Sequence, residues 1–145
     1  MASFPNHYTE NLARSGAGIS YLQEKKGCAK GKILVVLIGT NDCDSFYDDY
    51  AENYIDTIKQ LDAELTYVIS ILPRSYPGDA YNINTTICGM NQQIRFLVEQ
   101  NGWIYLNAYP LMINEEGICI NYFSDGLHLS QHGYEVLNKL VRDAI

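Results

Sequence analysis

The sequence has no long apolar run and no paired cysteine motif, and each absence excludes a class of protein. No stretch approaches the length of about 20 apolar residues that a membrane-spanning helix needs, and the N-terminus has no apolar signal region. We therefore expect no membrane association and favour a cytoplasmic location. The four cysteines form no Cys-x-x-Cys pair, which excludes zinc-ribbon and redox motifs. Three disulfide pairings remain open, but free thiols are expected without a secretory signal.

Positive charge is also scarce. Ten Lys and Arg residues against 17 Asp and Glu residues leave a net charge of −7. The one short basic run, residues 25–32, is best explained as a solvated helix end, and a surface for nucleic acid needs more basic side chains than this. The sequence has no repeat, low-complexity tract or linker, so we expect one domain over residues 1–145 and no nucleic-acid partner.

Three continuous apolar runs, typical of strands buried on both faces of a parallel sheet, alternate with segments of helical periodicity. This alternation predicts right-handed crossovers and helices on both sides of the sheet. Ligand sites in such sheets lie beyond the carboxyl ends of the strands, which here means "GTND", "PRSYPGD" and "AYPLM". The expected strands are 32–39, 65–72 and 103–108, and the expected helices are 47–62, 83–102 and Ser130 to the C-terminus.

Three motifs contain residue types that suit acyl-transfer chemistry. In "GTND", Gly39 allows close approach of the backbone to a ligand, and the Asn41 amide can donate to a developing oxyanion. In "NLARSGAGI", Gly16 lies at an expected loop-to-helix junction, where backbone N–H groups face an anion. In "DGLHLSQHGY", Asp125 and His128 precede a helix, and an Asp that orients a His is the general-base half of a nucleophile triad.

Each motif also has a simpler interpretation, which accounts for that motif alone. His128 and His132 have the spacing of zinc ligands on one helix, but a helix that begins after Ser130 carries only His132. The acidic stretch "NDCDSFYDD" lacks the turn glycine of a calcium loop, and a helix N-terminus explains its carboxylates. Asn41 can be a turn former and Gly16 a packing glycine. We expect no metal and no other cofactor.

In their order along the chain, the motifs resemble the blocks of the SGNH, or GDSL-type, esterases and lipases. "NLARSG" resembles the second block, "GTND" the third and "DGLHLSQHGYEVL" the fifth, and the match covers residues 11–145. The resemblance implies a three-layer α/β/α, flavodoxin-like fold. It also implies that the protein hydrolyses a carboxylic ester, such as a short acyl ester or an acetylated sugar. The implied roles are His128 as base, Asp125 as its orienting acid, Asn41 and Gly16 as oxyanion donors, and Gly39 and Asp42 as supports of the Asn41 loop.

The first block of that family is missing from this sequence. The block is a strand that ends in Gly-Asp-Ser, whose serine is the nucleophile, whereas the ten residues before Asn11 contain neither. Ala80 stands at the serine position of "PGDA", Ser3 has no strand to position it, and Ser15 lies within the second block, where the family does not use it as nucleophile. The nucleophile therefore stays unknown.

The missing strand would lie beside residues 32–39, which leaves an apolar edge that soluble proteins avoid. We expect a second copy of the chain, a complementing polypeptide or a rearranged N-terminus to cover it, and a truncated reading frame would explain the same gap. Three functions stay open. They are a Ser-His-Asp esterase for a small-molecule ester or acylated carbohydrate, an inactive SGNH-like binding module, and slow hydrolysis by water that His128 and Asp125 activate.

Overall fold

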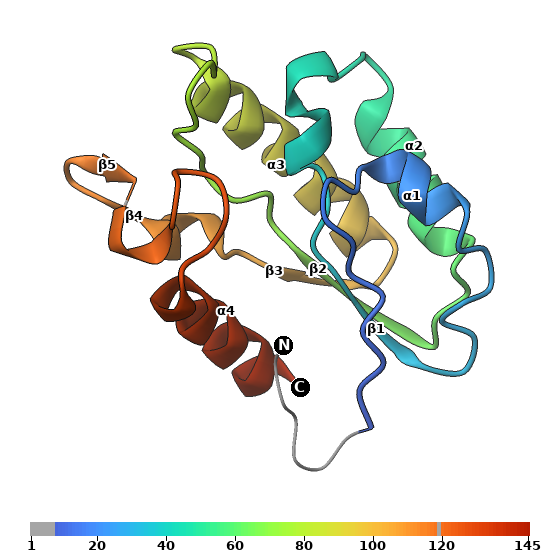
Figure 1. The fold of residues 1–145 in the computed structure, drawn as a ribbon. Coiled ribbons are helices and arrows are strands. Elements are labelled where there is room, and N and C mark those ends of the chain that lie inside the picture. The colour runs from blue at the N-terminus through green and yellow to red at the C-terminus, as the bar shows by residue number, and fades with distance from the viewer. Residues whose placement is uncertain (1–7, 119) are drawn as a thin grey trace.

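The computed structural model describes residues 8–118 and 120–145 and has an α/β fold built around a small parallel sheet (Figure 1). Strands and helices alternate along the chain, as the sequence pattern predicts. β1 spans Ile33–Val36, β2 spans Leu65–Ile69 and β3 spans Ile104–Leu106, in that order across the sheet. Both pairings are parallel, so the carboxyl ends of the strands meet at one edge.

Each strand is shorter than the apolar run that predicts it. The ladder between β1 and β2 ends where Val36 pairs with Val68. Beyond it, Gly39 has a φ of +120° and turns the chain out of the strand direction. Ile71 and Leu72 stay buried although they follow the end of β2. The apolar runs therefore mark the residues that are buried, and buried residues continue beyond the last hydrogen-bonded strand pair toward the carboxyl edge of the sheet.

Helices follow the strands at the predicted positions. α4 begins after Ser130, and the Ser130 hydroxyl accepts the N–H of Gly133, as a helix cap does. Short 3-10 helices and a small antiparallel hairpin occupy segments for which the sequence predicts no element. The helices are α1 (Ile19–Gln23), α2 (Tyr50–Lys59), α3 (Ile83–Gln100) and α4 (Gln131–Ala144), with η1 (Thr40–Ser45), η2 (Tyr109–Met112), η3 (Ile120–Tyr122) and the hairpin β4 (Ile113–Asn114) and β5 (Gly117–Ile118).

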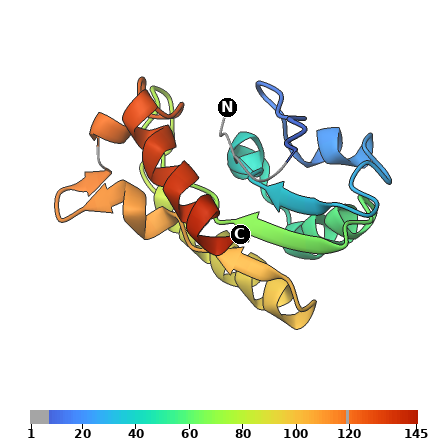
Figure 2. The same cartoon turned by 90° about the horizontal axis from the view of Figure 1, so that it is seen from below.

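The sheet separates two apolar clusters, which confirms the three-layer arrangement (Figure 2). On one face, Val36 and Val68 pack with the buried side chains of α2 and α3. On the other face, Tyr67 and Ile69 pack with the inner side of α4. Successive residues of a strand point to opposite faces, so each central strand contributes to both clusters.

The outer edge of β1 has no strand partner in the described part of the chain, where β1 pairs with β2 alone. Ile33, Val35 and Leu37 are 48%, 38% and 39% exposed. They alternate with Val36 and therefore lie on the face that α4 covers, but the cluster beneath α4 takes side chains from β2 and β3 and none from β1. An apolar stripe thus runs along the edge strand of the sheet.

Cys28, Cys43 and Cys88 are free thiols. Cys119 and Ser3 lie outside the described residues. Within the described ranges, no helix is both long enough and apolar enough to cross a membrane.

The two faces of α3 provide a matched test of the core. Ile94 is 1% exposed and Phe96, on the same helix, is 62% exposed. Ile94→Ala removes buried methyl groups and leaves a cavity, so it is expected to lower the free energy of unfolding by about 2–5 kcal/mol. Phe96→Ala is expected to change it by about 0.5 kcal/mol or less. Urea denaturation followed by circular dichroism measures both, and equal losses would contradict the assigned faces.

Candidate active site

The "GTND" turn begins at the carboxyl end of β1 and forms η1. Gly39 lies so close to Ile71 that a Cβ at this position would stand 2.7 Å from the Ile71 Cδ1 atom. A side chain here would also be strained by the positive φ. Gly39 therefore lets the chain leave β1 beside the end of β2.

Asp42 joins this turn to the loop before α1. Its Oδ2 atom accepts the N–H of Ile19 at 2.8 Å and the hydroxyl of Tyr50 at 2.6 Å. Burial and this hydrogen bond raise the pKa of Tyr50, so the phenol remains a donor. A Cβ on Gly18 would overlap the Asp42 carboxylate, which shows how closely the two loops approach. This geometry suits the predicted support of the Asn41 loop.

Asn41 and Gly16 come together through the same pair of loops. The Asn41 Nδ2 atom donates to the carbonyl of Ala17 at 2.9 Å, one residue after Gly16. Gly16 is exposed and has a φ of +74°. An amide nitrogen carries two hydrogens, so one N–H of Asn41 remains for a ligand. The second and third motifs are therefore joined by a hydrogen bond one residue from Gly16.

Asp125 and His128 form a hydrogen-bonded pair on an exposed loop. The His128 Nδ1 atom lies 2.7 Å from Oδ2 of Asp125. The Oδ1 atom accepts the backbone N–H groups of Leu127 at 3.0 Å and His128 at 2.7 Å. The hydrogen bonds from the His128 ring and its N–H lower the pKa of Asp125 to about 2. The carboxylate is therefore ionised and directs Nδ1–H inward, which leaves the Nε2 lone pair able to accept a proton.

The base of this loop is closed by backbone contacts. An antiparallel bridge joins Phe123 and Leu129, and the Ser124 N–H donates to the carbonyl of His128 at 2.8 Å. The Gly126 carbonyl accepts the N–H of Ser75 at 2.7 Å. The loop is thereby held both at its own ends and against the segment that follows β2.

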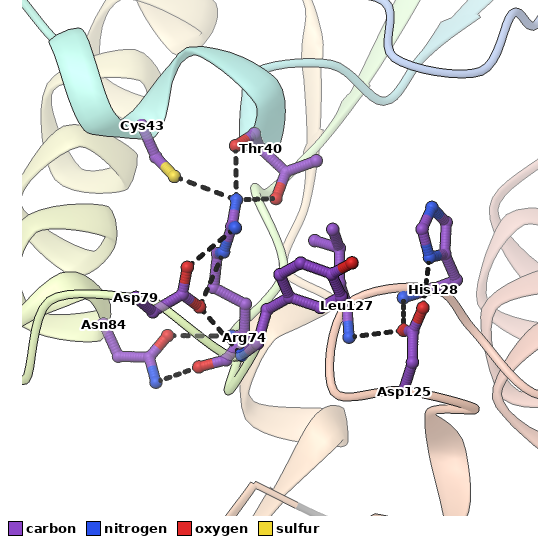
Figure 3. A network of polar contacts seen from close by, with 9 residues as sticks. Thr40, Cys43, Arg74, Asp79, Asn84, Asp125, Leu127 and His128 are labelled. Atoms are coloured by element: carbon purple, nitrogen blue, oxygen red, sulfur yellow. Dashed lines mark hydrogen bonds and ion pairs between the residues drawn. The ribbon is translucent and has the colours of Figure 1, made fainter.

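Arg74 is not among the site residues that the sequence predicts, yet it contacts Thr40 and Cys43 of η1 from the segment that follows β2 (Figure 3). Its side chain is 8% exposed and pairs with Asp79 at 2.8 Å. Its Nη1 atom also donates to the Thr40 carbonyl at 2.8 Å, immediately before Asn41. A single arginine in a proline-containing loop matches no motif. The one feature of the sequence that could have identified Arg74 as a site residue is its position after the carboxyl end of a strand.

A shallow hollow of about 240 Å³ opens beside Arg74. Its lining comes from the segment between β2 and α3, including Tyr76 and Tyr81, and from Ile118 of β5. In the described residues, no three His, Cys, Asp or Glu side chains are grouped as a metal ion requires. The site consists of hydrogen-bond donors and a carboxylate–imidazole pair.

Gly126 provides a test of how closely the Asp125–His128 loop is packed. Its φ is +85°, and a Cβ would overlap the Ser75 carbonyl. Gly102 has a φ of +70° with open space around it. Both Ala variants are expected to lose about 1–2 kcal/mol from the left-handed backbone. Gly126→Ala should lose a further 1–3 kcal/mol or so from overpacking. Urea denaturation compares them, and equal losses would show that the loop is loosely packed.

Comparisons with known proteins agree on the family. The sequence matches the family model of the GDSL-like lipase/acylhydrolase family over residues 2–136. No curated protein matches the sequence.

Solved structures share the fold. The structure of a GDSL-like lipase from Bacteroides thetaiotaomicron superposes with a TM-score of 0.75 at 20% identity, covering 90% of this chain and 71% of that one. A member of the lipolytic protein G-D-S-L family from Veillonella parvula gives a TM-score of 0.79 at 12% identity, covering 98% and 82%. A lipase/acylhydrolase from Enterococcus faecalis gives 0.65 at 20% identity, covering 90% and 71%. With the family model matching nearly the whole sequence, the chain belongs to the GDSL-like lipase/acylhydrolase family.

Proposed function

We propose that this chain supplies the base, the orienting acid and the oxyanion donors of a Ser-His-Asp carboxylic-ester hydrolase. The observation that carries the proposal is the 2.7 Å contact between Nδ1 of His128 and Oδ2 of Asp125, on a loop held at the sheet edge where Asn41 also lies. The substrate class is a small-molecule ester, with an acylated carbohydrate as one form.

Each residue has a definite part in the reaction. The Nε2 atom of His128 takes the proton of a serine hydroxyl as its oxygen attacks the ester carbonyl, and Asp125 stabilises the imidazolium that results. The Asn41 amide and the Gly16 N–H hold the negative oxygen of the tetrahedral intermediate. His128 then returns the proton to the departing alkoxide, which leaves an acyl-serine. Water activated by His128 hydrolyses that acyl group, so the cycle uses no cofactor.

The serine is proposed to come from an additional strand that pairs with β1. The exposed apolar stripe of Ile33, Val35 and Leu37 and the unpaired edge support this arrangement. A strand there would end at the same edge as "GTND" if it ran parallel to β1. A second copy related by a two-fold axis would instead pair its own β1 antiparallel, and β1 contains no serine. We therefore favour a complementing segment over a dimer.

Light scattering during size-exclusion chromatography tests the occupant of this edge. A complementing segment requires no self-association, so the purified chain is expected to be monomeric. A dimer that Val35→Asp dissociates, while Phe96→Asp on the opposite side of the sheet leaves it intact, would assign the edge to a second copy.

Exposure to a fluorophosphonate probe and turnover of p-nitrophenyl acetate test the chemistry. Because the serine is proposed to lie on the complementing segment, we expect no adduct on the chain alone and one adduct when a segment ending in Gly-Asp-Ser is added. Peptide mass spectrometry locates that adduct on the serine of the segment, and turnover is measured on the same mixture. Asn41→Ala should lower kcat about 10²–10³-fold. His128→Ala should lower it by about 10⁴-fold or more. His132→Ala, an exposed histidine four residues away, serves as the matched control and should keep wild-type turnover.

Two results would contradict the proposal in different ways. Full turnover by both the Asn41 and the His128 variants would reject the site assignment. A folded wild-type chain that gives neither adduct nor turnover with the complementing segment present would reject the esterase proposal and favour the binding module.

A further inference from the structure

We propose that Arg74 is a positioning residue that fixes the Asn41 turn relative to the Asp125–His128 loop. The inference rests on the proposed function for its catalytic consequence, because those two groups are the oxyanion donor and the base. Its structural content, a coupling of two loops through one buried guanidinium, stands on contacts alone (Figure 3).

The first half of the link runs from Arg74 to η1. The Nη1 atom donates to the Thr40 carbonyl at 2.8 Å and to the Sγ atom of Cys43 at 3.2 Å. Burial raises the pKa of the Cys43 thiol, so it is a neutral acceptor. These two contacts hold both the first residue of η1 and its buried side, and Asn41 lies between them in the sequence.

The second half runs through Asp79. Its carboxylate receives a parallel pair of hydrogen bonds from Arg74, Nε to Oδ2 at 2.9 Å and Nη2 to Oδ1 at 2.8 Å. The Oδ2 atom also accepts the N–H of Tyr76 at 2.9 Å. This closes the turn over residues 76–79. Ser75, between Arg74 and that turn, donates its N–H to the Gly126 carbonyl at 2.7 Å. The arginine fork therefore shapes the segment on which the Asp125–His128 loop is held.

The Arg74 backbone is anchored separately from its side chain. Asn84, on α3, accepts the Arg74 N–H and donates to the Arg74 carbonyl, each at 2.8 Å. Shortening the side chain therefore leaves the segment attached to α3 and removes the contacts that cross to η1. Lysine cannot replace the fork, because an ammonium group does not pair with Asp79 through two parallel bonds while reaching Thr40.

Hydrogen exchange measured by mass spectrometry tests the coupling without requiring enzyme activity. Arg74→Lys and Arg74→Ala are expected to speed exchange about tenfold in peptides covering 40–45 and 125–128, while α2 and α4 keep their protection. Arg95→Ala is the matched control, because it removes an exposed arginine that pairs with Glu99. Faster exchange in 40–45 alone would overturn the proposal, since Arg74 would then support only its own turn. If Arg74→Ala speeds exchange throughout the protein, it has unfolded the chain, and the milder variants Arg74→Lys and Asp79→Asn are used instead to test whether exchange rises in both loops.

Turnover of p-nitrophenyl acetate by the same variants tests the catalytic consequence. A displaced oxyanion donor should lower kcat by about 10²-fold while KM stays within about twofold. Unchanged kcat in an active protein would reject the positioning role and leave the proposed function standing. A wild type that stays inactive with the complementing segment present would reject the proposed function, and the exchange result would still decide whether Arg74 couples the loops.

Discussion

The buried guanidinium of Arg74 imposes a condition that two loops have to meet together. Removing such a charge from water is costly unless its N–H groups find partners, and breaking a buried pair leaves an uncompensated charge. Nε and Nη2 are satisfied by Asp79 and Nη1 by Thr40, so the turn after β1 and the segment after β2 complete one hydrogen-bond network. Burial opposes ionisation of Asp79, but the bonds from Arg74 outweigh it and lower the Asp79 pKa. This stabilisation is therefore present at neutral pH and is lost as the carboxyl becomes protonated in acid.

Asp42 joins η1 to the loop before α1 in a similar way, with a carboxylate that accepts hydrogen bonds in place of a guanidinium that donates them. One carboxylate oxygen accepts from Ile19 and from Tyr50, which come from segments on either side of it. Close backbone approach completes the arrangement, because Gly18 and Gly126 lie where any side chain would overlap a neighbour. The exposed Asn41 and the exposed Asp125–His128 pair thus stand on loops fixed by buried or half-buried contacts. Such support is what a site on loops requires to keep a defined geometry.

The sequence predicts the parts of this molecule that depend on local pattern. The apolar runs and helical periodicity predict every strand of the parallel sheet and the two crossover helices, and Ser130 marks the start of α4. The spacing of three residues brings Asp125 and His128 together on one short loop. The approach of Asn41 to the carbonyl of Ala17 spans 24 residues and is suggested only by the family resemblance. Arg74 escapes prediction because its importance comes from partners 34 residues upstream and five downstream, which no spacing rule connects. The sequence also does not predict where the strands end, because buried apolar residues continue past the last hydrogen bond between the strands.

The order of the strands has a consequence for how the chain folds. β1, β2 and β3 are neighbours in space in the same order as in sequence, so every crossover joins adjacent strands. A crossover to the adjacent strand closes a shorter loop than one that skips a strand, and so costs less conformational entropy. The sheet and its first helical layer can therefore assemble progressively as the chain leaves the ribosome. The layer formed by α4 arrives last, and with it the loop that carries the histidine.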